Sequence, residues 1–332
     1  MTALEISELA VRFATEDGDV LAVKDVSLSV RPGEILALCG ESGCGKSVTA
    51  MAVSRLLPPN ARISGSVRLD GRELTGLSER ELRQVRGKDV SMVFQEPMTS
   101  LNPSFTVGFQ IDEVLRQHEK LSRRAARVRT VELLELVGIA DPARRCREYP
   151  HQLSGGMRQR VMIAMAVACS PRVLIADEPT TALDVTIQAG VLDIFRDLAD
   201  RLGTAIVLIT HDLGVVAAVA DQVAIMYAGR LVERAGVTEL FAAPRHPYTV
   251  GLLGALPAAV SRISDGTRGR LVEIPGMLPD PRRDGDDCAF APRCRRAEPD
   301  CAAARPALAG TGRSTVDKYS HQLACFHPEA VR

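Results

Sequence analysis

The residues best suited to chemistry form a glycine-rich segment near the N-terminus. The segment Gly40-Glu41-Ser42-Gly43-Cys44-Gly45-Lys46-Ser47 fits the pattern G-x-x-x-x-G-K-[ST]. It follows the apolar run 35–39 and stands where a helix over about 46–57 is expected, so that backbone N–H groups and a helix N-terminus can surround phosphate groups. The pattern predicts that Lys46 reaches the outer phosphates and that Ser47 binds Mg²⁺.

Two adjacent carboxylates end a second apolar run. Asp177 and Glu178 follow the residues 173–176, and such strand ends are common by themselves. In the presence of a phosphate loop, Asp177 is predicted to help hold Mg²⁺, and Glu178 is predicted to orient and polarise the attacking water. His211 follows the apolar run 205–210 and is a candidate contact for the γ-phosphate, although a lone histidine is more often structural.

A second candidate anion site lies in the middle of the chain. Ser154, Gly155 and Gly156 precede a helical stretch at 157–169 and offer free N–H groups and a hydroxyl. The alternative interpretation is an ordinary helix cap followed by glycines. One phosphate chain rarely needs two such sites from one subunit, so the second site is predicted to serve the nucleotide of a partner subunit.

The surrounding pattern predicts an α/β fold. Apolar runs at 35–39, 173–176, 205–209 and 223–226 are separated by helical stretches, which indicates buried parallel strands with crossover helices. Residues 4–13 and 20–30 alternate as an antiparallel strand pair, 63–74 as short strands and 78–87 as a short helix, and about 105–170 is predicted to be a helical insertion. Prolines become frequent near residue 257. We therefore expect a core at 1–256 and a C-terminal extension at 257–332.

Composition excludes several classes of protein. The chain has 332 residues, 46% of them hydrophobic, and 41 basic side chains balance 41 acidic ones. This excludes a disordered chain and argues against a nucleic-acid partner, which needs a basic surface. The longest apolar run has nine residues, Val161–Cys169, too few to span a membrane. We expect that the N-terminal residues are not a secretory signal. We expect a cytoplasmic location.

Half of the eight cysteines lie in the extension. Cys288, Cys294, Cys301 and Cys325 follow the spacing C-x5-C-x6-C-x23-C. By number alone these thiols suit a [4Fe–4S] cluster or Zn²⁺ equally, and unligated thiols are the alternative. His321 and His327 flank Cys325 and could substitute as ligands, although they are interpreted first as solvated surface residues. Cys44 lies inside the phosphate loop, so we predict that alkylation of Cys44 inhibits ATP hydrolysis and that ATP protects.

Taken together, the motifs resemble those of ABC transporter ATPase subunits. The order is phosphate loop, Gln95, the segment Leu153–Met157, Asp177-Glu178, Ala182-Leu183-Asp184 and His211. The resemblance covers about 4–255 and implies a head-to-tail dimer that holds two ATP molecules. It implies catalytic roles for Glu178, His211, Lys46 and Gln95. It also implies ATP contacts from Phe13, Gly40, Glu41, Ser42, Gly43, Cys44, Gly45, Lys46, Ser47, Val48, Gln95, Asp177, Glu178 and His211, and contacts in trans from Ser154, Gly155, Gly156 and Asp184. Mg²⁺ would be held by Ser47, Gln95 and Asp177, and Phe13 is either an adenine-stacking ring or a core residue.

Other stretches resemble the oligopeptide/dipeptide permease ATPases, a group that includes nickel and some glycan importers. They are residues 95–103, 163–166, 177–186 and 246–249, together with Ile274-Pro275-Gly276, Pro292-Arg293-Cys294 and Ala324-Cys325 in the extension. The resemblance implies ATP-driven uptake of peptides, or of nickel, oligosaccharide or another solute. It favours a [4Fe–4S] cluster at the four cysteines over zinc.

The same resemblance implies a set of partners. Two transmembrane permease subunits, a second ATPase subunit (the same chain or a different one) and an extracytoplasmic solute-binding protein are expected, with this chain at the cytoplasmic face of the membrane. Gln95 and residues 96–103 are expected to face the membrane partner. A non-transport ABC ATPase that acts on DNA or ribosomes is the alternative from another class.

Overall fold

A twisted sheet of parallel strands forms the centre of the molecule. The computed structural model describes residues 2–96, 100–181, 183–255, 274–311 and 319–330. Strand β3 (Ile35–Cys39) pairs in parallel with β8 (Ala205–Thr210) and β9 (Gln222–Tyr227), and β7 (Val173–Asp177) joins β8 to β6 (Val90–Val93). The four apolar runs in the sequence are therefore the buried strands that they predicted. Strand β6 was not predicted, because four residues give too little periodicity.

Both faces of this sheet are covered, which explains why its strands are apolar throughout. In β7, Leu174 and Ala176 pack into the cluster with the helices, whereas Val173 and Ile175 pack into the cluster with the N-terminal strands. Every residue of β3, β7, β8 and β9 is buried. The carboxyl ends of the parallel strands share one edge, so residues far apart in sequence meet there.

A second, antiparallel sheet covers one face. Its order is β2–β1–β4–β5, built from β1 (Leu4–Thr15), β2 (Gly18–Val30), β4 (Ala61–Leu69) and β5 (Arg72–Glu73). Helix α1 (Lys46–Val53) contacts β1, β2 and β7 and so lies between the two sheets. The helix ends at Val53, four residues before the end predicted at about Leu57. The capped helix α2 (Glu79–Val85) follows β5, close to the range predicted for it.

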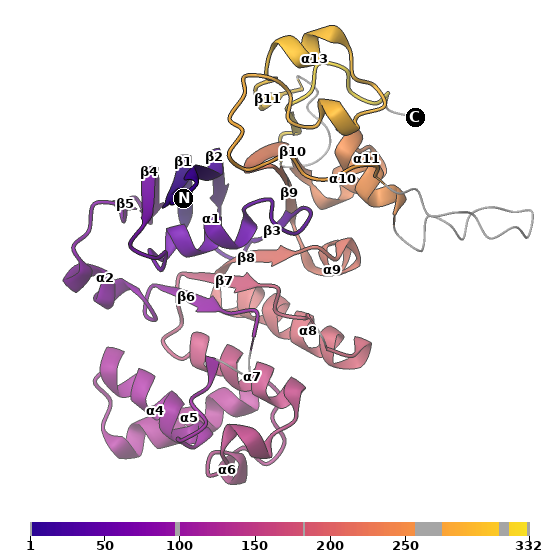
Figure 1. Ribbon diagram of the computed structural model, residues 1–332. Helices are drawn as coiled ribbons and strands as arrows, with labels where there is room; N and C mark the ends of the chain where they lie inside the picture. The colour runs from indigo at the N-terminus through magenta and orange to yellow at the C-terminus, as the bar shows by residue number, and fades with distance from the viewer. Residues whose placement is uncertain (1, 97–99, 182, 256–273, 312–318, 331–332) are drawn as a thin grey trace, which may run out of the picture.

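The helices predicted near 105–170 form a separate group. They are α4 (Val107–His118), α5 (Arg123–Leu136), α6 (Pro142–Arg145) and α7 (Gly155–Ala166), with a 3₁₀ turn at Pro150–Gln152. Figure 1 shows them below β6, away from the antiparallel sheet. Helices α8 (Val185–Leu202) and α9 (Leu213–Val219) pack on the central strands. Within the described ranges, no helix is both long and apolar enough to cross a membrane.

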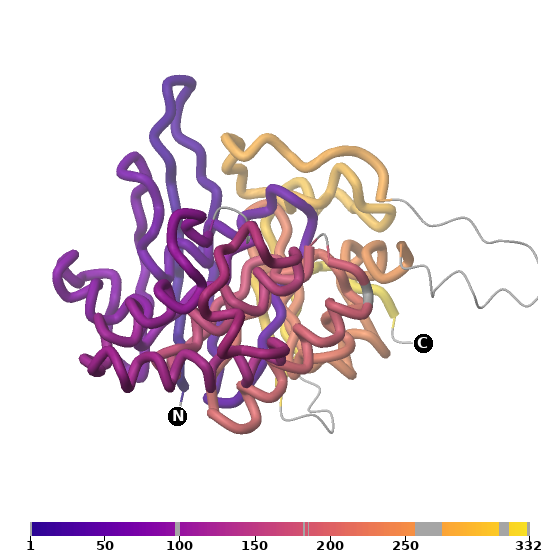
Figure 2. Tube along the Cα trace, turned by 90° about the horizontal axis from the view of Figure 1, so that it is seen from below, coloured from indigo at the N-terminus to yellow at the C-terminus, as the bar shows by residue number. Residues whose placement is uncertain are grey.

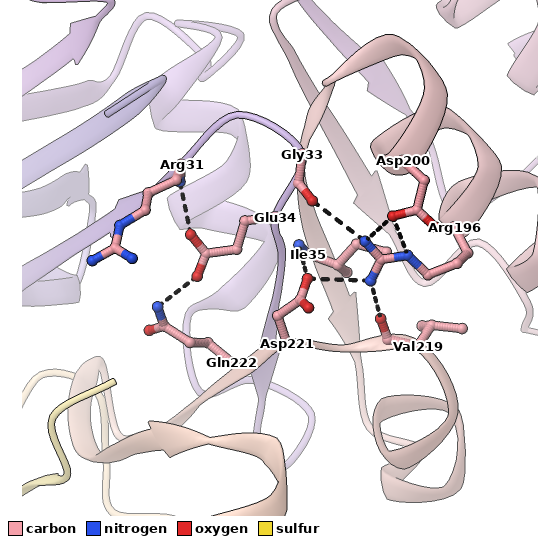
Figure 3. A network of polar contacts seen from close by, with 9 residues as sticks. All are labelled: Arg31, Gly33, Glu34, Ile35, Arg196, Asp200, Val219, Asp221 and Gln222. Atoms are coloured by element: carbon pink, nitrogen blue, oxygen red, sulfur yellow. Dashed lines mark hydrogen bonds and ion pairs between the residues drawn. The ribbon is translucent and has the colours of Figure 1, made fainter. Parts of the chain in front are cut away.

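The start of β3 is held by a network of polar contacts. Asp221 accepts hydrogen bonds from the Ile35 N–H group at 2.9 Å and from Arg196 of α8 at 3.2 Å. Glu34 accepts from the Arg31 N–H group and from Gln222, and Arg196 also donates to the Gly33 carbonyl (Figure 3). The network fixes β3 between α8 and β9 and thereby positions the loop at the other end of the strand.

The C-terminal extension is attached along the opposite edge of the sheet. Strand β10 (Arg230–Gly236) pairs with β9 and with β12 (Gln322–Leu323), which pairs with β11 (Ala309–Gly310). Helices α10 (Val237–Ala242) and α11 (Pro247–Gly254) precede it, and a 3₁₀ turn at Ala291–Arg293 and α13 (Pro299–Ala303) lie within it. Figures 1 and 2 show the yellow extension on the β9–β10 side of the molecule, with the tip of the β1–β2 hairpin projecting beside it in Figure 2. The expected junction at 256–257 lies outside the described residues.

Candidate functional site

The glycine-rich loop curves tightly between β3 and α1. A side chain at Gly40 would collide with the Met226 carbonyl, and Gly45 has φ +106°, so glycine is required at both positions. Lys46 is the first residue of α1 and is only 5% exposed. Its Nζ donates to the carbonyl oxygens of Gly40 at 2.8 Å and Glu41 at 2.9 Å. The loop thus forms a closed ring of backbone around an ammonium group, which suits a polyphosphate.

Ser42 is part of this loop, and Val48 lies in the first turn of α1. Cys44 is 1% exposed, and burial raises the pKa of its thiol although Lys46 lies nearby. A buried thiol that stays protonated reacts slowly with alkylating reagents. Burial therefore argues against fast alkylation of Cys44, and its alkylation stays a prediction.

A hydroxyl and a carboxylate meet beside the loop. Ser47 Oγ donates to Asp177 Oδ1 at 3.0 Å, across 130 positions of sequence. Asp177 is 5% exposed, and burial raises the pKa of its carboxyl although Ser47 donates to it. A cation at this position would relieve the cost of burying the charge. Two hard oxygen ligands with room for phosphate oxygens and water fit Mg²⁺, which usually binds one or two carboxylates.

Glu178 is the centre of a second group of side chains. Its carboxylate accepts from Gln95 Nε2 at 3.2 Å and from Thr181 Oγ1 at 2.9 Å, and it lies 3.2 Å from His211 Nδ1. These neighbours follow β6, β7 and β8, whose carboxyl ends share one edge. The structure therefore brings together Gln95, Glu178 and His211, while Asp177 precedes Glu178 in the chain. Thr181 was not singled out as a site residue in the sequence.

The segment Ser154–Gly156 begins α7. Ser154 Oγ accepts from the Met157 N–H group at 3.3 Å and caps the helix. A Cβ at Gly155 would meet no atom within 4 Å, whereas one at Gly156 would lie 2.7 Å from Ile187 of α8. In Figure 1, β6 and β7 lie between α1 and α7. Asp184 caps α8 by accepting from the Ile187 N–H group at 2.9 Å, and the neighbouring Ala182 lies outside the described residues.

Phe13 lies beside a cavity of about 570 Å³. The ring is partly buried against the N-terminal core, and the cavity is also lined by Val20 and Gly43 on one side and by Leu278 and Pro281 of the extension on the other. The packing fits the core interpretation of Phe13, and adenine stacking stays a prediction. The ring packs on the core and still presents a surface to the cavity.

The four cysteines of the extension surround one small pocket. The Cys288 N–H group donates to the Cys301 carbonyl at 2.8 Å. Burial raises the pKa values of Cys288, Cys294 and Cys325, and their mutual proximity raises them further. In the described residues, the single group of three candidate ligand atoms within 4.8 Å of one another is Asp300, Cys301 and His327. No three of the four sulfurs are that close, whereas the ligands of one tetrahedral zinc lie about 3.8 Å apart, as the Zn–S length implies.

Sequence reasoning missed several contacts of the extension. His321 is 1% exposed and lies between Glu233 and Glu239, so its interpretation as a surface residue is wrong. Arg293 binds Glu41 of the phosphate loop, and the Tyr248 hydroxyl accepts from the Glu41 N–H group at 2.9 Å. These contacts join segments more than 80 positions apart, which a single sequence does not reveal.

The parallel sheet, the phosphate loop at its edge and the helical group define an ATP-binding cassette, one class of P-loop ATPase. Two solved structures share the fold. A dimeric ATP-binding cassette, MJ0796, in a post-hydrolysis state bound to ADP and Pi has a TM-score of 0.64 at 27% identity, over 70% of this chain and 98% of that chain. The protein cbiO1 of Clostridium perfringens, part of the ABC transporter complex cbiONQ, has a TM-score of 0.62 at 28% identity. The match covers 73% of this chain and 91% of that chain.

Relatives specify the family. Residues 23–181 match the family described as ABC transporter, and 232–301 match the family described as oligopeptide/dipeptide transporter, C-terminal region. A probable peptide ABC transporter ATP-binding protein of Sinorhizobium fredii is 51% identical over 99% of this chain and 96% of its own length. The oligopeptide transport ATP-binding protein OppD of Bacillus subtilis is 53% identical over 87% of this chain and 80% of its own length. The chain spans 52% of the length of the Mycobacterium tuberculosis OppD, at 49% identity. The chain belongs to the ABC transporter family, among its ATP-binding subunits with this C-terminal region, and is an ATPase.

Proposed function

We propose that this ATPase energises the uptake of oligopeptides or dipeptides through a membrane complex. The observation that carries the catalytic part is the meeting of Gln95, Glu178 and His211 beside the pair Ser47 and Asp177. Water attack on the γ-phosphate needs one group to orient the water and others to stabilise charge on the phosphate. The peptide cargo is supported by the names of the relatives and by the matching C-terminal region.

In this proposal, the loop residues 40–48 bind the phosphates of ATP, and Lys46 leaves the loop carbonyls to contact the outer phosphates. Ser47, Asp177 and Gln95 would hold Mg²⁺, which when bound would supply positive charge near the phosphates. Glu178 orients water and accepts its proton as the bond from phosphorus to the ADP oxygen breaks, and His211 contacts the γ-phosphate. Adenine lies beside Phe13, where the cavity is mainly apolar.

The segment Ser154–Gly156 acts on the ATP of a second subunit. The open space around Gly155 and the exposed start of α7 support a site for the ATP of a partner ATPase, with Ser154, Gly155, Gly156 and Asp184 in trans. The dimeric cassette bound to ADP and Pi supports a dimer. A Ser154→Arg variant is expected to lose turnover and to keep ATP binding, because the arginine blocks only the partner's phosphate. Loss of binding in isolated subunits would contradict the assignment in trans.

A surface near Gln95 supports a membrane partner. Phe94 precedes Gln95 and is 42% exposed, and Phe105 and Phe109 are also exposed, with their rings stacked at 4.7 Å between centroids. Of the segment 96–103 expected here, residues 97–99 lie outside the described part. We propose that permease subunits cover this surface on the cytoplasmic face of the membrane and that a solute-binding protein delivers peptide to them. Exposed aromatic rings are typical of interface centres.

The test uses Glu178→Gln protein, which is expected to bind ATP without hydrolysing it. Isolated from membranes of its own cells in the presence of ATP, it should carry two polytopic subunits, and vesicles containing the wild-type complex should take up peptides. Uptake of nickel or oligosaccharide instead would change the cargo. Recovery of nucleic acid without membrane subunits would favour a non-transport ATPase.

We also propose that Cys288, Cys294, Cys301 and Cys325 hold a [4Fe–4S] cluster. The support is the position of the four cysteines around one pocket, together with the resemblance of the extension to that of the permease ATPases. Anaerobic purification should yield about four iron and four sulfide per chain, as the cluster formula requires. One zinc per chain without sulfide would favour zinc, and a fully folded, metal-free protein would contradict both.

A further inference from the structure

One arginine of the C-terminal extension reaches into the phosphate loop. Arg293 Nη1 and Nη2 donate to the two carboxylate oxygens of Glu41 at 2.8 and 3.0 Å, so the ion pair is bidentate. Glu41 is the second residue of the loop, and 252 positions separate the two partners. Side-chain exposure is 6% for Arg293 and 27% for Glu41, so the contact is mostly shielded from solvent.

The arginine is fixed on every side. Its Nε donates to the Pro275 carbonyl at 2.8 Å, and its guanidinium lies 5.8 Å from the centre of the Tyr227 ring. Tyr227 and Tyr248 pack edge to face at 4.7 Å, and Phe290, three residues before Arg293, packs on both rings. Tyr248 in turn accepts from the Glu41 N–H group. Glu41 is therefore held at its main chain by the core and at its side chain by the extension.

The position of Glu41 creates an electrostatic problem for a phosphate loop. A carboxylate a few ångströms from bound phosphates repels them, and the repulsion is strong where solvent is excluded. The bidentate pair with Arg293 neutralises this charge and draws the carboxylate toward the extension. Lys46 is then the loop's uncompensated charge, and it is positive.

We propose that Arg293 is a positioning residue for the ATPase reaction: it holds and neutralises Glu41 and thereby sets the affinity of the phosphate loop for ATP. The inference rests on the proposal that ATP phosphates bind at residues 40–47. It gives the extension a direct part in nucleotide binding, in addition to whatever its cysteines hold.

The test is ATP binding by the full-length chain with Mg²⁺, measured by titration calorimetry. Arg293→Gln should raise the Kd for ATP about tenfold, since one partner of a shielded charge pair is left alone. A double variant that combines Arg293→Gln with Glu41→Gln also lacks the repelling charge. Its Kd should return to within about threefold of wild type. Raising the salt concentration should narrow the difference in Kd between Arg293→Gln and wild type, because ions screen the repulsion between Glu41 and the phosphates.

Two controls separate the alternatives. Arg282→Gln removes an equally charged but exposed side chain of the extension, which pairs with Asp280, and should leave the Kd unchanged. Lys46→Ala should abolish binding, and normal binding by this variant would refute the proposed site itself. If Lys46→Ala fails to bind while Arg293→Gln binds normally, or the double variant binds no better than Arg293→Gln, the role of Arg293 is refuted. Should Arg293→Gln not fold, Arg293→Lys must still raise the Kd, and an unchanged value overturns the proposal.

Discussion

Glu178 combines an unusual backbone with a crowded carboxylate. Its φ is +47°, which costs a residue other than glycine about 1 kcal/mol, and its N–H group donates to the Ile209 carbonyl at 2.9 Å. The strained turn directs the side chain toward Gln95 and His211 at the end of the sheet. Neighbouring strands hold it there, so the fold itself sets the geometry of the carboxylate that we propose as the base.

At this residue, Glu178→Gln should lower phosphate release at least 100-fold, because an amide keeps the shape of the side chain but cannot accept a proton from water. ATP binding should persist. In the presence of ATP, a stable dimer should then accumulate, which size-exclusion chromatography can detect. Thr181→Val, which removes one hydrogen bond to the same carboxylate, serves as a control and should retain most of the turnover. Phosphate release within tenfold of wild type in Glu178→Gln would remove Glu178 from its role.

Residue types and their order predicted most of the side chains that meet at the site, whereas Gln95 came from the family resemblance and Thr181 was missed. The phosphate loop, Asp177, Glu178 and His211 were predicted because each follows an apolar run that is too uniform to be anything but a buried strand. The burial of Cys44 and of His321 was not predicted. Burial depends on which segments pack around a residue, and those segments are distant in sequence.

Among the elements, the pair α7 and α8 explains why two adjacent glycines differ. Gly156→Ala places a methyl group 2.7 Å from two Ile187 carbons, so the helices must separate. We expect a loss of about 1–3 kcal/mol in the free energy of unfolding, as for other overpacked sites. Gly155→Ala enters open space and should leave the thermal midpoint unchanged or slightly higher. Equal midpoints for the two variants would contradict this packing.

The junction of β10 and the extension is predicted to depend on pH. Burial by itself would lower the pKa of His321, but its hydrogen bonds to Glu233 at 2.8 Å and Glu239 at 3.0 Å outweigh burial and raise it above 6.5. The neighbouring His246 stays neutral, since burial lowers its pKa to about 4. The charged His321 therefore stabilises the fold fully below pH 6.5, and this contribution is lost as the pH rises through the raised pKa.

The measurement is the thermal midpoint of wild type and His321→Gln between pH 6 and pH 9. The difference should be largest near pH 6, where breaking the buried pair costs about 3 kcal/mol, and should shrink toward pH 9. His151→Gln, in an exposed turn, is the matched control and should show no such trend. A difference that stays constant with pH would mean that His321 acts through packing alone.

In the whole molecule, the extension contacts the nucleotide end of the core at several points. Besides Arg293 and Glu41, Lys24 of β2 donates to the Arg283 carbonyl at 2.8 Å, and Leu278 lies 4.0 Å from where a side chain at Gly43 would begin. The sequence predicted an extension from its prolines and cysteines but gave no reason to place it against the phosphate loop. Such a contact is a property of the fold, because no periodic pattern encodes it.

These contacts predict reciprocal coupling between ATP and the cysteine pocket. Arg293 directly precedes Cys294, so if its pair with Glu41 contributes to ATP binding, bound ATP must favour the formed pair by the same factor. We expect the adjacent pocket to share part of that stabilisation. In metal-free protein, ATP should slow the labelling of Cys288 and Cys294 about fivefold, which mass spectrometry can follow for each cysteine. The half-buried Cys169 of the core should label at an unchanged rate. The slowing should disappear in Arg293→Gln at saturating ATP, and its persistence there would show that ATP reaches the pocket through other contacts.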